Sequence, residues 1–274
     1  MLVDSHVHVV SRDHGTHPLR PNHPGLTWIT EHACETEEYA ALMDANGIGH
    51  AVLVQAMGAY TDDNSYCVES ANADARRFAS VVYVDAHGDD PASTLDRWVA
   101  RGATGVRIVA VTGPLDDPAV EALWDHAATA GIPIVATMLA PELAHLPGLL
   151  ERYPDVSVAL DHCGFPDLSG GPGYPAARPL FELAAFPNLH AKVSTNALDL
   201  AVEGRGDPRD FVAAMAEAYG ASRLQWGSDW SQTHDRPFAD LVAYARRSFS
   251  VLADDARWPL GDTALAFWFA SAPS

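Results

Sequence analysis

The first β-rich run of the chain, Leu2–Val9, reads Leu-Val-Asp-Ser-His-Val-His-Val and carries two histidines near its end. It opens a series of eight such runs, which alternate with segments of helical length. Strands that alternate with helices predict a parallel sheet, and eight strands close a (β/α)₈ barrel. No G-x-G-x-x-G sequence follows the first run, which disfavours an open, doubly wound nucleotide-binding sheet. We therefore expect a single α/β domain, a TIM barrel, over residues 1–274.

Glycines mark the ends of several helical segments, at Asn46-Gly47, Gly102, Gly131 and Gly220. The other predicted strands are His50–Gln55, Ser80–Asp85, Gly105–Ala110, Ile132–Met138, Val156–His162, Leu189–Ser194 and Leu224–Asp229. The predicted helices are Thr36–Asn46, Tyr66–Phe78, Pro91–Arg101, Pro118–Ala130, Glu142–Tyr153, Arg178–Ala185 and Pro208–Tyr219.

Most of the predicted strands are apolar along their length and end in a polar side chain. In a parallel barrel all the C-terminal strand ends meet at one mouth, where active sites lie. Three long connections follow strands on this same face, and we expect residues 10–35, 163–179 and 195–207 to form lids. The polar strand-end residues are His6, His8, Gln55, Asp85, Arg107, Thr137, His162, Ser194 and Asp229.

The composition disfavours several classes of partner. The chain has 17 Lys and Arg against 36 Asp and Glu, a formal net charge of -19, which repels nucleic-acid phosphates and anionic membranes. It contains no apolar run of about 18 residues that could span a bilayer. The cysteines Cys34, Cys67 and Cys163 form no C-x-x-C pair, which favours a reducing cytosol over a disulfide framework. Without a signal-peptide pattern at its start, the chain is expected to be cytoplasmic and to bind a small molecule, and a homo-oligomer is compatible with its sequence.

The histidine pair His6 and His8 and the carboxylate Asp229 form the main candidate site. Side chains two residues apart point to the same face of a strand, so both rings should face the barrel mouth. Such a pair can hold a divalent metal or polarise a substrate carbonyl, although local hydrogen bonds could also satisfy both rings. The last strand neighbours the first in a closed barrel, so Asp229 should lie beside them and is suited to take a proton from attacking water. An alternative role for Asp229, as the N-cap of the helix expected near residue 236, is disfavoured because Asp229 lies too far upstream of that helix.

Three motifs in this order resemble the amidohydrolase superfamily: Asp4-x-His6-x-His8, Leu160-Asp161-His162-x-Gly164 and Trp226-Gly227-Ser228-Asp229-Trp230. The resemblance covers nearly the whole chain and is greatest to the branch that holds 2-pyrone-4,6-dicarboxylate lactonase and sugar lactonases, which Gly105-Val106-Arg107 also resembles. It implies a barrel hydrolase in which Asp229 is the general base toward water. It further implies that His6, His8 and His162 polarise the scissile carbonyl.

The metal-binding pattern of the superfamily is incomplete in this chain. Binuclear relatives carry a bridging Lys or Glu on the fourth strand and a His on the fifth, where this chain has Arg107 and Thr137. We therefore expect no binuclear centre. One divalent ion such as zinc, held by His6, His8 and Asp229, fits the ordinary arrangement of three protein ligands and a water. The same branch includes an enzyme that works without metal, so a metal-free mechanism stays equally open.

A second departure concerns the substrate. The pyrone-dicarboxylate lactonase has an arginine shortly after the sixth-strand histidine to bind a carboxylate, and this chain has Phe165 there. Arg107 can still bind an anion through its guanidinium, or it pairs with a strand-end acid such as Asp85. Lys192 is expected to contact the substrate, with a buried counter-ion as the alternative. The residues expected to bind substrate are Arg107, Gln55, Lys192, Trp28, Phe165 and Trp230, and the three aromatic ones favour a less charged, more apolar compound.

These features predict a hydrolase that cleaves a lactone or ester C–O bond of a small organic substrate with water activated by Asp229. The alternative within the superfamily is a metal-dependent non-oxidative decarboxylase or hydratase, which generally uses the fifth-strand histidine that Thr137 replaces. A third hypothesis is a barrel that binds a ligand without catalysis. Such a barrel would typically have lost one of the four candidate catalytic residues. All four are present: His6, His8, His162 and Asp229.

Overall fold

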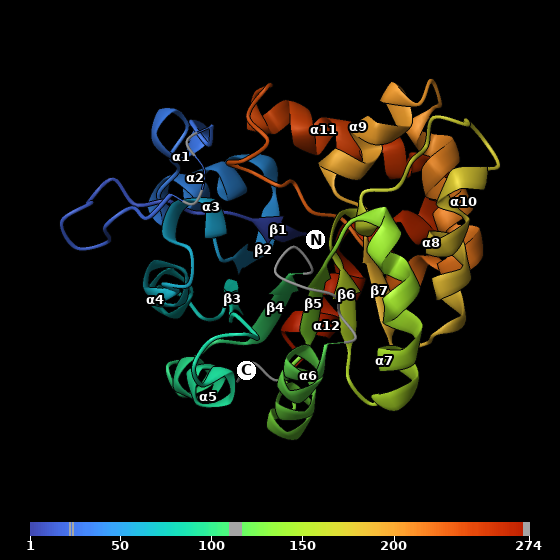
Figure 1. The fold of residues 1–274 in the computed structure, drawn as a ribbon. Helices are drawn as coiled ribbons and strands as arrows, with labels where there is room; N and C mark the ends of the chain where they lie inside the picture. The colour runs from blue at the N-terminus through green and yellow to red at the C-terminus, as the bar shows by residue number, and fades with distance from the viewer. Residues whose placement is uncertain (22, 24, 110–116, 271–274) are drawn as a thin grey trace.

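The computed structural model describes residues 1–21, 23, 25–109 and 117–270 and contains a barrel of eight parallel strands (Figure 1). The strands follow one another around the sheet in chain order. This confirms the predicted α/β barrel, and Ala110, the last residue of the predicted fourth strand, lies outside the described residues. The strands are β1 (Leu2–Val7), β2 (Ile48–Val54), β3 (Phe78–Tyr83), β4 (Gly105–Val109), β5 (Ile134–Thr137), β6 (Val158–Leu160), β7 (Leu189–Lys192) and β8 (Leu224–Gln225).

Helices surround the barrel between successive strands (Figure 1). They are α1 (Trp28–Glu31), α2 (Thr36–Asn46), α3 (Met57–Tyr60), α4 (Ser65–Ala73), α5 (Pro91–Ala100), α6 (Pro118–Ala130), α7 (Leu146–Arg152), α8 (Arg178–Glu182), α9 (Thr195–Glu203), α10 (Pro208–Tyr219), α11 (Phe238–Phe249) and α12 (Thr263–Trp268). The bounds of α2, α6 and α10 are those predicted, because glycines in left-handed backbone end α2 and α6, with φ of 72° at Gly47 and 67° at Gly131. Among the described residues, none of these helices is long and apolar enough to cross a bilayer.

Several predicted segments differ from the structure. The expected lid over residues 195–207 is wrong in part, because most of it is helix α9, whose N-cap Ser194 accepts a hydrogen bond from the Ala197 backbone. The predicted helix Glu142–Tyr153 divides into a 3₁₀ segment, Ala140–His145, and α7. The predicted helix Tyr66–Phe78 ends early, because Phe78 already begins β3.

The barrel closes where β1 meets the segment that follows β8. Backbone hydrogen bonds run from Ser5 N to Trp226 O and from Asp229 N to His6 O, each 2.9 Å long. The buried Asp4 carboxylate adds a side-chain hydrogen bond across the closure, since its Oδ1 accepts from Ser228 N at 2.8 Å. Gly227 permits this close approach, since a Cβ there would lie 2.6 Å from the Cβ of His6. Closure therefore sets Asp229 directly beside the first strand.

The inside of the barrel below the mouth is mainly apolar and is covered at its other end by the last helix. Val52, Val81 and Val135 are fully buried and pack in one cluster with α12. In that helix Trp268 donates its indole N–H to Gln225 Oε1 at 2.9 Å. Helix α12 was not among the helices predicted from the sequence. It leaves the C-terminal strand ends as the open face of the barrel, where the candidate site lies.

Candidate active site

Four polar side chains meet at the mouth of the barrel, and each is at most 3% exposed: His6, His8, His162 and Asp229. The strands β6 and β8 are shorter than predicted, so His162 and Asp229 lie in the turns after them. Both have left-handed backbone, with φ of 52° and 59°. This conformation costs a non-glycine residue about 1–3 kcal/mol and concentrates at functional sites.

Hydrogen bonds fix which ring nitrogen carries the proton in each neutral strand-1 histidine. His8 Nδ1 donates to the Val54 carbonyl at 2.8 Å. His6 Nδ1 lies 3.0 Å from Asp161 Oδ1, and a carboxylate can only accept there. A neutral imidazole has one N–H, so Nε2 of both rings presents a lone pair.

These two lone pairs converge with one oxygen of Asp229. His6 Nε2 and His8 Nε2 are 3.3 Å apart, and Asp229 Oδ1 lies 3.7 Å from the first and 3.5 Å from the second. Asp229 Oδ2 accepts from the Thr233 hydroxyl at 3.1 Å. Oδ1, by contrast, is buried without a hydrogen-bond partner among the described residues. Three buried acceptors thus face a common point with no donor between them.

The charge states suit this arrangement. Burial by itself raises the pKa of the Asp229 carboxyl, but the imidazoles of His162, His8 and His6 outweigh it, so that the pKa lies below its usual value. Burial lowers the pKa of His6 well below its usual value and also lowers that of His162. At neutral pH the Asp229 carboxylate is therefore ionised and the rings of His6 and His162 are neutral, the forms in which these groups bind metals or accept protons.

His162 and the predicted aromatic residues surround the histidine pair. His162 Nδ1 is hydrogen-bonded to Ser194 Oγ at 2.8 Å, and its ring centroid lies 4.7 Å from that of His6 and 4.7 Å from that of Phe165. The Trp28 ring lies 6.0 Å from His8. Trp230 packs edge-on against Phe238, with centroids 5.4 Å apart. Trp28 and Phe165 are thus in contact with the histidines, whereas Trp230 contacts α11.

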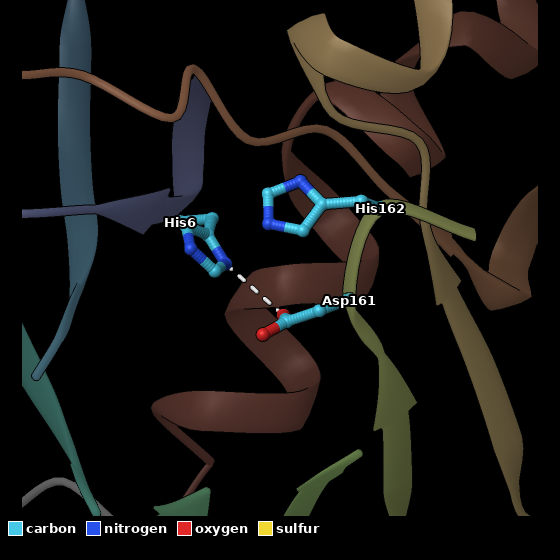
Figure 2. Close-up of side chains that lie close together, drawn as sticks. All are labelled: His6, Asp161 and His162. Atoms are coloured by element: carbon cyan, nitrogen blue, oxygen red, sulfur yellow. Dashed lines mark hydrogen bonds and ion pairs between the residues drawn. The ribbon is translucent and has the colours of Figure 1, made fainter. Parts of the chain in front are cut away.

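Asp161 is a member of this cluster that the sequence analysis named only as part of a motif. It is fully buried and meets four partners, two at each oxygen. His6 Nδ1 and Lys192 Nζ each lie 3.0 Å from Oδ1, while Thr137 Oγ1 at 2.7 Å and Arg107 Nε at 3.2 Å contact Oδ2. Figure 2 shows the His6 ring joined to this carboxylate, with the His162 ring beside it. Its position at the end of β6, directly before His162, was the available sequence signal.

This network changes the interpretation of the two basic residues. Lys192 is fully buried and paired with Asp161, so the structure shows the buried counter-ion that was the alternative to a substrate contact. Arg107 pairs with Asp161 rather than with Asp85, and its Nε donates to Thr137 Oγ1 at 2.7 Å. Arg107 keeps 8% of its surface exposed, so substrate binding by its terminal nitrogens stays a prediction.

Gln55 lies at the end of β2, but its amide is committed to the neighbouring loop. Its Nε2 donates to the carbonyls of Asp63 at 2.7 Å and Thr61 at 3.3 Å. The side chain is fully buried, and its Oε1 has no partner among the residues that the structure describes. Its predicted contact with substrate stays a prediction.

Two groups of side chains have the spacing of metal ligands, namely His6, His8 and Asp229, and His6, Asp161 and His162. The first group fits an ion. Ligand atoms about 2.1 Å from a tetrahedral zinc lie about 3.4 Å apart, and His6 Nε2, His8 Nε2 and Asp229 Oδ1 are separated by 3.3, 3.7 and 3.5 Å. In the second, both Asp161 oxygens and His6 Nδ1 are already engaged with protein partners. The mouth can therefore hold one divalent ion at the predicted ligands.

The sequence is similar to those of known proteins. A sequence model of the family described as amidohydrolase matches residues 3–270. L-fucono-1,5-lactonase from Burkholderia ambifaria is 30% identical over 215 residues, which cover 71% of this chain and 69% of that protein.

Solved structures with the same fold include enzymes of more than one name. A Pseudomonas putida protein given the name 2-pyrone-4,6-dicarboxylic acid hydrolase superposes with a TM-score of 0.79 at 24% identity, covering 97% of each chain. An amidohydrolase from Burkholderia multivorans with bound zinc has a TM-score of 0.77 at 23% identity, covering 98% of this chain and 99% of that one. The 5-carboxyvanillate decarboxylase from Sphingomonas paucimobilis has a TM-score of 0.68 at 17% identity, covering 97% and 98%. At these identities the structures support the fold alone.

Proposed function

The chain belongs to the amidohydrolase family, and we propose that it hydrolyses the C–O bond of a small lactone or ester. The observation that carries this proposal is the unpartnered Oδ1 of Asp229, a buried carboxylate oxygen aimed between His6 Nε2 and His8 Nε2. An ionised carboxylate without a donor is suited to take a proton from water. The relative named L-fucono-1,5-lactonase supports a lactone as the substrate class.

In the proposed reaction a water attacks the carbonyl carbon and gives a proton to Asp229. The bond from that carbon to the ring oxygen then breaks, and the proton is returned to this oxygen, so that lactone and water yield a hydroxy acid. The Thr233 hydroxyl, which donates to Asp229 Oδ2, orients the carboxylate so that Oδ1 faces the water. In the metal-free form His162, whose Nδ1 is hydrogen-bonded to Ser194 Oγ, donates its other ring N–H to the developing oxyanion, whereas the Nε2 lone pairs of His6 and His8 accept from the attacking water.

We propose His6, His8 and Asp229 as the ligands of a single zinc ion in the metal-dependent form. Such an ion would polarise the carbonyl and lower the pKa of water. The related fold with bound zinc supports this choice of metal. A second ion is disfavoured, because Thr137 on β5 offers a hydroxyl that is already shared between Arg107 and Asp161.

The surroundings of the site favour a neutral or monoanionic compound. Lys192 has no exposed surface, so Arg107 is the one basic residue of this network with surface left to reach an anion. Trp28 and Phe165 present aromatic faces next to His8 and His162. Sugar 1,5-lactones match this site, because their ring offers C–H faces to the aromatic residues and hydroxyls to the polar ones.

The second candidate is decarboxylation, which is favoured by the decarboxylases among proteins of the same fold. The third is a barrel that only binds a ligand. One experiment separates the three hypotheses: purified protein, with and without added zinc, is assayed against neutral and monoanionic lactones and against hydroxybenzoates. Ring opening without release of carbon dioxide supports the proposal, and release of carbon dioxide supports the decarboxylase. If neither reaction occurs, the result supports the barrel that only binds a ligand.

A further inference from the structure

The fully buried carboxylate of Asp161 lies between the catalytic mouth and two basic side chains. Each of its oxygens meets two partners, so its orientation is fixed from both sides. On one side Thr137 bridges it to Arg107, because the threonine hydroxyl donates to Asp161 and accepts from Arg107 Nε. On the other side it meets the ring of His6 and the ammonium of Lys192.

The contact with His6 decides where the proton of that ring lies. Lys192 Nζ is 3.5 Å from His6 Nδ1, and Asp161 Oδ1 is 3.0 Å from the same atom. An ammonium can only donate and a carboxylate can only accept, so these two neighbours favour opposite tautomers. The shorter contact favours Nδ1–H. Without the carboxylate, Lys192 would donate to Nδ1 and move the proton to Nε2.

A proton on Nε2 would disable the mouth. That nitrogen is 3.3 Å from His8 Nε2 and 3.7 Å from Asp229 Oδ1, so its N–H would point at the acceptors that face water or a metal ion. Asp229 would then gain a donor for its unpartnered oxygen. The ring would also lose the lone pair with which it can act as a ligand.

Lys192 is held in this competing position from below. Its Nζ lies 5.5 Å from the centre of the Trp268 ring of α12, and the side chain is fully buried. Its ion pair with Asp161 offsets the cost of burying the ammonium. A residue enclosed in this way has a partner inside the protein and no route to a ligand in the mouth.

We propose that Asp161 is a positioning residue, which holds His6 as the Nδ1–H tautomer with its Nε2 lone pair toward Asp229, and that Lys192 serves Asp161 as a counter-ion. The proposal concerns the site of the proposed hydrolysis and gives two residues outside the reacting set a defined role there. The tautomer itself does not depend on which substrate is bound.

The test is the tautomer of His6 in the full-length chain, read by two-dimensional ¹⁵N–¹H NMR of ¹⁵N-histidine-labelled, chelator-treated protein. The His6 signals are identified by their loss in His6→Gln. Wild type is expected to show Nδ1–H, whereas Asp161→Asn, which replaces the carboxylate by an amide of the same shape, is expected to show Nε2–H. A wild-type His6 with Nε2–H overturns the proposal even if the variant does not fold.

Two matched variants separate positioning from structure. Asp4→Asn alters another buried carboxylate, which accepts from the His6 backbone and not from its ring, and should leave the tautomer unchanged. Lys192→Met removes the competing donor and should also retain Nδ1–H. A change of tautomer in either variant contradicts the proposal.

Zinc affinity is the second readout, measured by competition with a chromogenic chelator. Loss of a partner that orients a metal-binding histidine typically weakens affinity by about 10–100-fold, and Asp161→Asn should fall in that range. Unchanged affinity in a folded Asp161→Asn variant argues against the proposal. Neither readout needs a substrate, so a correct tautomer without lactone hydrolysis refutes only the proposed function, and hydrolysis with the wrong tautomer refutes only this inference.

Discussion

Replacement of Asp229 by asparagine tests the assignment of the general base. The amide has the shape of the carboxylate, and its oxygen can still accept from Thr233. Its NH₂ group would then occupy the place of Oδ1, where it can donate toward His6 Nε2 at 3.7 Å and His8 Nε2 at 3.5 Å. Asp229→Asn should therefore fold, but it lacks the basic carboxylate oxygen. Its amide also places a donor where the lone pairs of His6 Nε2 and His8 Nε2 point.

The expected loss follows from the role assigned to that oxygen. General-base catalysis typically increases the rate by about 10²–10⁴-fold. Its removal therefore raises the activation free energy by about 2.7–5.5 kcal/mol. We expect kcat to fall by that factor and KM to change little, in steady-state assays on the best lactone of the panel. Asp85→Asn is the matched control, because Asp85 is a partly buried carboxylate after β3 that accepts from the His87 backbone outside the cluster. Near-normal turnover by Asp229→Asn would refute the reasoning and make His162 the next candidate for the base.

Three further predictions concern the substrate, the metal and the barrel closure. Arg107→Ala should raise KM more for a monoanionic lactone than for a neutral one of the same ring, and an equal effect on both in steady-state kinetics would show that Arg107 does not bind the anion. Elemental analysis after reconstitution with zinc should find at most one ion per chain, and two bound ions would contradict the assigned ligand set. Tyr39→Phe removes the hydroxyl that donates to buried Asp4 at 2.8 Å, so urea titration should give a free energy of unfolding lower by about 1–3 kcal/mol. An unchanged value would mean that this contact adds nothing to the β1–β8 closure.

The convergence of His6, His8 and Asp229 could be predicted because it follows from topology. Eight strands in sequential order bring the last beside the first, and residues two apart on a strand share a face. The strand count and the positions of the polar strand ends were therefore enough to predict it. The bounds of α2, α6 and α10 were predictable for a similar reason, since their end residues have strong local preferences.

The network around Asp161 could not be predicted in the same way. Its partners come from β1, β4, β5 and β7, and the sequence does not show which of several strand-end side chains meet across the barrel. A fully buried lysine is rare, so Lys192 was assigned to the substrate rather than to a carboxylate. Helix α9 was missed because Ser194 was interpreted as a polar strand end, although it is the N-cap of that helix.

The central claim is that water attacks the carbonyl of a lactone at the Asp229 cluster. Its most direct test is ring opening of the best lactone in ¹⁸O-labelled water, with the product analysed by mass spectrometry and fragmentation. The account predicts one ¹⁸O atom in the new carboxylate, at a rate that depends on Asp229. An ¹⁸O atom in the product hydroxyl, or ring opening no faster than without the protein, would contradict it.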